Sequence, residues 1–124
     1  MRERVIRLFY MSISIIKESI SHSVLAELAK ERFGDMVKAV VDIEKELMVV
    51  DEQLHSDEEI ILIQDGSSQG NLWGINIYPD NIGDERIEFD SMINVRPRQG
   101  NRSRDVENKD VRNKIIDVVN KLIL

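Results

Sequence analysis

The chain contains no cysteine, which excludes disulfide bonds, thiolate nucleophiles and every metal site that needs a cysteine ligand. This absence fits the reducing environment of the cytoplasm. The sequence also lacks any apolar run close to the roughly 20 residues that a membrane-spanning helix requires. We therefore expect a cytoplasmic protein that has no membrane partner.

Several catalytic and cofactor signatures are missing as well. The sequence has no GxSxG, no P-loop, no GxGxxG, no HExxH pair and no EF-hand loop. These absences remove the usual support for a hydrolase, a nucleotide-phosphate site, a dinucleotide site or a metal centre. We accordingly expect no cofactor and no bound metal.

The first ten residues are basic and apolar, yet they do not resemble a signal peptide. Arg7 interrupts the apolar run, and no small-x-small cleavage site precedes Lys17-Glu18. Met11 is a second candidate start, so residues 1–10 are interpreted as an N-terminal extension. A chain of 124 residues has the length of one domain, and we expect residues 11–124 to form a single α+β domain.

Charge is unevenly distributed along the chain. The 17 lysines and arginines face 23 aspartates and glutamates, a formal net charge of −6, which makes general binding to nucleic acid unfavourable. The stretch from Arg96 to Arg104 (RPRQGNRSR) nevertheless holds four arginines and no acid. The stretch from Asp51 to Asp65 holds six acids and no lysine or arginine. The sequence thus carries two short segments of opposite charge.

The first half of the chain has strand and helix patterns in turn. Isoleucines two apart predict a strand over residues 12–17, and the next apolar positions have helical spacing between a cap at Ser21 or Ser23 and a stop at Gly34. Alternation over residues 37–43 and a β-branched run over 47–50 predict a tight hairpin. Because its outer positions Val40, Met48 and Val50 are also apolar, we expect both faces to be covered, one of them by a second subunit.

The second half contains one segment with two interpretations. Ser56 and Glu59 have the spacing of a capping box and favour a helix over residues 57–65, whereas the apolar run over residues 60–63 favours a strand. We predict the helix. Alternation then predicts two antiparallel strands, over residues 73–77 and 87–95, that pair with Ile77 opposite Ile87 and Gly74 opposite Asp90. The apolar stripe from Val111 to Ile123 predicts a C-terminal helix.

The predicted order is β-α-β-β-α-β-β-α. It indicates an α+β fold with a mostly antiparallel sheet of about five strands and three helices that cover one face of the sheet. The exposed apolar positions of the hairpin further predict a homo-oligomer, with a homodimer as the simplest closed form.

Several motifs together resemble a family of short prokaryotic proteins classed only as a domain of unknown function. They are DMVKAVVDIEKE (35–46), LWGINIYP (72–79), IEFDSMINVRP (87–97) and GNRSR (100–104). The chain departs from the family pattern at Val50-Asp51, where glycine is expected, and at Ser56, where alanine is expected. The resemblance implies no activity.

The polar positions of the last two predicted strands form one candidate site. Side chains two apart share a strand face, so carboxylates, amides and a guanidinium gather beside Gly74, where the missing side chain leaves room for a ligand. The alternative is a solvated sheet face with cross-strand pairs. The candidate ligand-binding residues on this face are Asn76, Asp90, Asn94 and Arg96.

The arginine-rich stretch supplies the remaining candidates, Asn101, Arg102 and Arg104. A reversal at Gly100-Asn101 would bring Arg96, Arg102 and Arg104 to one side as a clamp for phosphate or a carboxylate, which guanidinium groups recognise in a planar, two-pronged way. The alternatives are internal pairing with the acids of residues 51–65 and binding to an acidic surface of a partner protein. Nucleic acid is the least favoured partner.

His55 and Asp90 are the candidate catalytic residues. His55 lies in the acidic sequence LHSDEE and would act as a general base oriented by a carboxylate, or else as a structural histidine at a helix start. Two function classes follow. The first is a self-associating binding module that uses the arginine-rich loop, and the second is a small enzyme that acts on an anionic substrate with His55 or Asp90 as acid or base.

Overall fold

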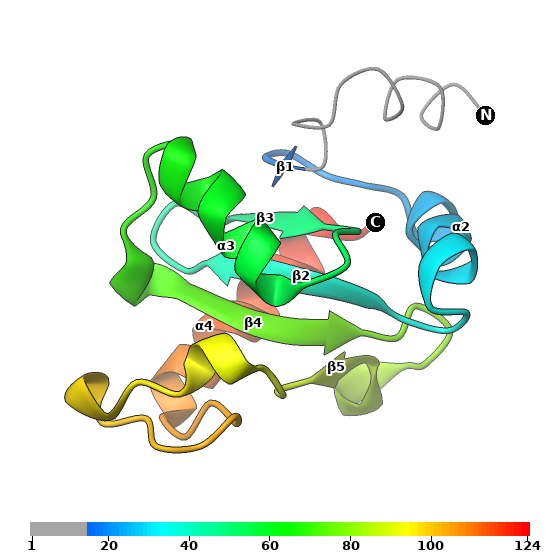
Figure 1. Cartoon of the computed structure of the whole chain (residues 1–124). Coiled ribbons are helices and arrows are strands. Elements are labelled where there is room, and N and C mark those ends of the chain that lie inside the picture. Colours follow the sequence, from blue (N-terminus) through cyan, green and yellow to red (C-terminus); the bar gives the residue numbers. More distant parts are fainter. Residues whose placement is uncertain (1–14) are drawn as a thin grey trace.

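The computed structural model describes residues 15–124 (Figure 1). Its helices and strands are β1 (Ile15–Ile16), α2 (His22–Arg32), β2 (Val37–Asp42), β3 (Leu47–Val50), α3 (His55–Gln64), β4 (Leu72–Ile77), β5 (Ile87–Glu88) and α4 (Lys109–Leu122). This order confirms the predicted α+β arrangement. The candidate extension and the first residues of the predicted strand over residues 12–17 lie outside the described residues.

The described strands form one antiparallel sheet in the order β1-β3-β2-β4-β5. Strands β2 and β3 make the predicted hairpin, and β4 pairs with the other edge of β2. Ile77 lies opposite Ile87, which confirms the predicted register of β4 and β5 at that point.

Helices cover both faces of the sheet (Figure 1), so the prediction that they cover one face is wrong. Helices α2 and α4 pack on the face that includes Ala39 and Ile75, whereas Leu62 of α3 packs on the opposite face against Val40 and Val49. The physical reason lies in the hairpin, because its strands are apolar at successive positions and therefore need cover on both sides.

The same packing explains the apolar hairpin positions that led us to expect a second subunit. Val40 and Met48 have no exposed surface, and Val50 is 1% exposed within a single chain. Intramolecular helices thus supply the cover that we had assigned to a partner. Self-association therefore stays a prediction, and the apolar hairpin positions no longer support it.

Helix α2 has the predicted ends. Ser21 Oγ accepts a hydrogen bond from the Val24 amide, and Gly34 follows the C-cap with a φ of +96°. The left-handed region favours glycine because a Cβ is strained there. The helix therefore ends where the sequence indicates.

Helix α3 begins two residues earlier than predicted. Leu54 is its N-cap, without a side-chain cap bond, so Ser56 lies inside the helix and the predicted capping box does not form. Asp51 belongs to the pair Val50-Asp51, where the resemblance led us to expect glycine, and it adopts a φ of +71° just before this helix. The side chain of Asp51 accepts a hydrogen bond from Arg32 Nε at 3.2 Å, which holds this turn against α2.

Strand β5 ends at Glu88, so the predicted strand over residues 87–95 is wrong beyond that point. The following residues, Phe89–Asp105, leave the regular ladder and run beside β4 through two short 3-10 turns, Met92–Asn94 and Pro97–Gln99. We call residues 89–105 the edge segment. Most of the predicted site residues belong to it or contact it.

Candidate functional site

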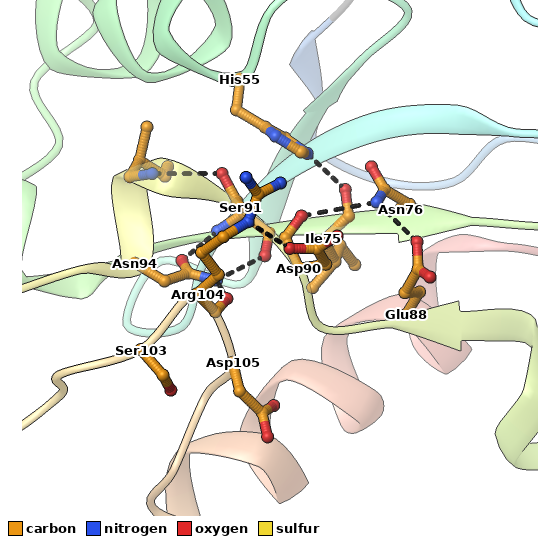
Figure 2. A network of polar contacts seen from close by, with 12 residues as sticks. His55, Ile75, Asn76, Glu88, Asp90, Ser91, Asn94, Ser103, Arg104 and Asp105 are labelled. Atoms are coloured by element: carbon orange, nitrogen blue, oxygen red, sulfur yellow. Dashed lines mark hydrogen bonds and ion pairs between the residues drawn. The ribbon is translucent and has the colours of Figure 1, made fainter.

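The edge segment is attached to β4 mainly through side chains. Asn94 Oδ1 accepts a hydrogen bond from the Gly74 amide at 2.8 Å, and Asn94 Nδ2 donates to the Gly74 carbonyl at 2.9 Å (Figure 2). The same amide donates to the Arg104 carbonyl at 3.0 Å. Asn94 is fully buried and thus replaces the backbone of a neighbouring strand.

The protein itself fills the space beside Gly74, so the prediction of room for a ligand there is wrong. The predicted pairing of Gly74 with Asp90 is also wrong. A Cβ on Gly74 would lie 2.5 Å from Ser91 Oγ and 2.6 Å from Ser91 Cβ. Glycine is therefore required by the close approach of the edge segment. Asp90 does not lie opposite it in a ladder.

Arg96 is a partly buried member of the same attachment, with 11% of its side chain exposed. Its Nε donates to the Ile93 carbonyl at 2.9 Å, Nη1 donates to the Gln69 carbonyl at 3.1 Å, and Nη2 donates to the Leu72 carbonyl. The guanidinium carbon lies 4.7 Å from the centre of the Trp73 ring. Burial lowers the pKa of Arg96, an effect that the nearby Glu59 carboxylate opposes.

Asn101 organises the turn in the arginine-rich stretch. The predicted reversal is present, because Gly100 has a φ of +80° and the amide of Arg96 donates to the Asn101 carbonyl at 2.7 Å. The buried Asn101 side chain donates to the carbonyls of Asn94 and Asp105, each at 2.7 Å. Asn94, Arg96 and Asn101 therefore act together to hold the edge segment.

A second set of polar side chains, which includes four of the candidates (His55, Asn76, Asp90 and Arg104), gathers on the α3 face, near one end of the sheet. Lys38 lies opposite Asn76 across β2 and β4, and Asn76 lies opposite Glu88 across β4 and β5. Asn76 Nδ2 donates to Glu88 Oε1 at 2.8 Å (Figure 2). We call the following set the polar cluster: Lys38, His55, Asn76, Glu88, Asp90 and Arg104.

Arg104 and Asp90 form the exposed part of the polar cluster. Arg104 Nε lies 2.5 Å from Asp90 Oδ1, and the two side chains are 55% and 44% exposed. An ion pair through Nε leaves the two terminal nitrogens of the guanidinium for another acceptor. Within residues 15–124, the side-chain hydrogen bond of Arg104 is made through Nε, and no hydrogen bond to either terminal nitrogen is found.

His55 projects from the start of α3 towards the sheet (Figure 2). Its Nε2 lies 2.7 Å from the Ile75 carbonyl, which can only accept, so Nε2 carries the hydrogen and Nδ1 has the lone pair in the neutral ring. Burial lowers the pKa of His55, and the charges of Lys38, Asp90 and Arg104 also act on the ring. A neutral histidine next to an exposed ion pair is therefore expected at neutral pH.

The candidates thus separate into two groups. Asn94, Arg96 and Asn101 bind backbone groups of the protein, whereas His55, Asn76, Asp90 and Arg104 come together in the polar cluster. Arg102 is exposed, and within residues 15–124 no ion pair is formed by its side chain. The expected pairing with the acids of residues 51–65 occurs at one arginine, since Arg96 Nη2 lies 3.7 Å from Glu59 Oε2.

Lys38 and Glu58 were not among the sequence candidates. Both could have been found from the sequence. Lys38 alternates with the apolar residues of β2, which places it on the polar face, and Glu58 follows His55 by three positions, which places it on the same side of α3. Glu58 has no exposed surface, and Oε2 accepts a hydrogen bond from the Glu52 amide at 3.2 Å. Burial raises the pKa of Glu58 well above its usual range, a direction that the charges of Glu52 and Asp51 reinforce.

We predict that replacing Glu58 with glutamine makes the protein less sensitive to rising pH. Between the unfolded carboxyl pKa of about 4.3 and the raised pKa of the folded state, only the folded protein binds this proton. Its stability therefore falls as pH rises, by up to about 1.4 kcal/mol per pH unit. Glu58→Gln should remove this slope in urea unfolding measured from pH 4 to 8. Exposed Glu44→Gln is the matched control, and a Glu58→Gln profile parallel to that of the wild type would contradict the prediction.

No helix in the described part of the chain is long and apolar enough to cross a membrane. Neither the curated proteins nor the solved structures contain a match to the chain. A family model does match, however, and it spans residues 14–122, which include every element from β1 to α4. The chain therefore belongs to the family described as "Protein of unknown function (DUF5674)".

Proposed function

We propose that the protein is a binding module that holds a small anionic ligand, phosphate or a carboxylate, at Arg104 beside the polar cluster. Arg104 would contact the ligand with its two terminal nitrogens, and exposed Arg102 would add a second positive charge. Asn94, Arg96 and Asn101 would serve this site by fixing the loop that carries Arg104.

The ion pair between Arg104 and Asp90 is the observation that carries this proposal. Asp90 engages Nε, so it orients the guanidinium while its planar outer edge stays available for two-pronged recognition. Asn94 also holds the Arg104 carbonyl, which limits the motion of the main chain at that position. A preoriented guanidinium loses less conformational entropy on binding than a free one.

A titration with inorganic phosphate and with succinate, followed by NMR through backbone amides, tests the proposal. We expect chemical-shift changes concentrated on residues 88–105 and an affinity that falls as salt rises. Arg104→Gln should weaken binding by about tenfold, because a charge-assisted two-pronged contact contributes roughly 1.5 kcal/mol or more. Arg104→Lys should also weaken binding, since lysine keeps the charge but loses the planar fork.

Arg98→Gln is the matched control, because Arg98 belongs to the same stretch and is exposed. Its affinity should stay within about twofold of the wild-type value. Shift changes scattered over the whole surface, or equal losses for Arg98→Gln and Arg104→Gln, would contradict a site at Arg104 and favour general charge attraction.

The position of His55 supports a second candidate, a small enzyme that acts on an anionic substrate. A neutral Nδ1 with a fixed tautomer is the form that a general base needs, and the Asp90–Arg104 pair lies near enough for its charges to act on the ring. The same NMR samples separate the two functions. The enzyme would be favoured if the wild type converted the added compound and the His55→Gln variant still bound the compound but no longer converted it.

A further inference from the structure

His55 has a ring nitrogen that is free to accept a hydrogen bond. Nε2 lies 2.7 Å from the Ile75 carbonyl and donates to it, which leaves the lone pair of the neutral ring on Nδ1. Within residues 15–124, no hydrogen bond to Nδ1 is found. Because His55 is only 8% exposed, water replaces the missing partner in part at most, and a ligand that supplies a donor is favoured there.

Asn76, the residue after Ile75, presents a second acceptor of this kind (Figure 2). Its Nδ2 donates to Glu88 Oε1 at 2.8 Å and to the Asp90 carbonyl at 3.4 Å. A carboxylate and a carbonyl only accept, so the amide nitrogen must face them, and this fixes the orientation of Oδ1. Oδ1 is buried and, in the described part of the chain, has no hydrogen-bond partner. The start of α3 and strand β4 therefore each present an acceptor without a donor.

The donors of the polar cluster are directed to other groups. Arg104 binds Asp90 Oδ1 through Nε, and the Lys38 ammonium lies 5.5 Å from the centre of the Phe33 ring. The terminal nitrogens of Arg104 form no hydrogen bond within residues 15–124. The site thus has a pair of unused donor nitrogens and two unused acceptors, which do not satisfy one another.

These unused groups lie in one neighbourhood on the α3 face of the sheet. Figure 2 shows Arg104, His55 and Asn76 around the same part of β4. A simple carboxylate satisfies the donors of Arg104 and leaves the acceptors as they are. A ligand that satisfies both sides carries a carboxylate and a hydrogen-bond donor a short distance apart.

The donor that suits His55 is uncharged. Burial lowers the pKa of His55, and the charges of Lys38 and Arg104 act in the same direction, against that of Asp90. The ring therefore lies where positive charge is disfavoured. An ammonium group would meet this repulsion and would also lose its hydration, whereas a hydroxyl group donates a hydrogen bond without a charge. A hydroxy acid thus fits the site better than an amino acid.

We propose that the ligand of this site is a small hydroxycarboxylate, whose carboxylate binds the terminal nitrogens of Arg104 and whose hydroxyl group donates to His55 Nδ1. The partial negative charge of Asn76 Oδ1 adds to the preference for a donor at this position. This inference rests on the anion site proposed at Arg104 and adds the chemical class of its ligand.

The test is an NMR titration of the full chain with matched acids, lactate against propionate and 3-hydroxybutyrate against butyrate. The two pairs place the hydroxyl group one or two carbons from the carboxylate. We expect the hydroxy acid of at least one pair to bind about fivefold more tightly than its partner, as one neutral hydrogen bond to a poorly hydrated acceptor allows. Alanine, which carries an ammonium group in place of the hydroxyl of lactate, should bind more weakly than lactate.

The 15N resonance of His55 Nδ1 gives a direct readout in the wild-type protein. It should shift with the hydroxy acid and stay in place with the matched acid that lacks the hydroxyl group. His55→Phe, studied at a temperature where its melting curve shows a folded protein, should remove the advantage of the hydroxy acid and leave propionate binding within about twofold. His22→Phe is the matched control, because His22 is exposed and contacts the Pro79 carbonyl instead.

The outcomes separate this inference from the anion site on which it rests. Equal binding within both pairs, with shift changes on residues 88–105, would overturn the hydroxycarboxylate and leave the anion site in place. An advantage of the hydroxy acid that persists in His55→Phe, without a shift of Nδ1 in the wild type, would overturn the role of His55. No shift change on residues 88–105 with any of the four acids would remove the anion site itself.

Discussion

Replacing Asn94 with alanine is expected to lower the free energy of unfolding by about 3 kcal/mol. The change removes three hydrogen bonds, two of them to Gly74, and leaves the amide and carbonyl of a buried strand without a partner. An unpaired buried polar group costs about 1–3 kcal/mol, so the two Gly74 groups carry most of the effect. Urea unfolding followed by circular dichroism measures it.

Exposed Asn81→Ala is the control for the Asn94 experiment. It removes one hydrogen bond, from Asn81 Nδ2 to the Glu85 carbonyl, in a loop that water can reach. Its effect should stay below about 1 kcal/mol. Equal losses in the two variants would mean that the edge segment contributes little to the stability of β4.

Replacing Arg96 with lysine is expected to destabilise the protein by about 2–4 kcal/mol, although the charge is kept. The guanidinium binds three carbonyls, those of Gln69, Leu72 and Ile93, and lies over Trp73. A lysine ammonium cannot reach three acceptors in this planar arrangement, and its burial beside Glu59 would be poorly compensated.

The thermal midpoint provides the measurement for Arg96→Lys, with Arg98→Lys as the matched substitution on the exposed side of the same stretch. Arg98→Lys should leave the midpoint almost unchanged. A stable Arg96→Lys protein with impaired anion binding would reverse our assignment and make Arg96 a ligand-binding residue, as the sequence had first led us to expect.

The sheet and its neighbours could be predicted to a large extent from local patterns. Alternation located β2 and β4, a β-branched run located β3, and the positions of Ile77 and Ile87 gave the correct register between β4 and β5. The stripe of α4 and the cap at Ser21 were also evident, because they depend on residues close together in the sequence.

The edge segment could not be predicted in this way. Residues 87–95 alternate as a strand would, but the Asn94 side chain takes the place of backbone groups in the contact with Gly74. Nothing in the local pattern distinguishes an asparagine that binds a distant strand from one on a solvated face. The structural roles of Arg96 and Ser91 were missed for the same reason, because Arg96 binds Leu72 across 24 residues of chain and Ser91 contacts Gly74, which is also distant in the sequence.

The polar cluster was predicted in part. Strand alternation brought Asn76 and Asp90 together in our prediction, and His55 was chosen for its chemistry. Its position beside them depends on α3 covering the opposite face of the sheet, which the expectation of helices on one face did not allow. The apolar residues on both faces of the hairpin could have indicated this arrangement, because Val40 and Val49 need a helix of the same chain to cover them.

The attachment of the edge segment also protects the molecule against unwanted polymerisation. Beyond its short pairing with β5, strand β4 has amide and carbonyl groups that a strand from another molecule could extend into a larger sheet. Asn94 and Arg96 occupy the groups of Gly74 and Leu72 without adding a strand whose own outer edge would be open. Local release of residues 89–105 would remove these contacts and expose this edge of β4. The loop thus keeps a native sheet from acting as a template for aggregation.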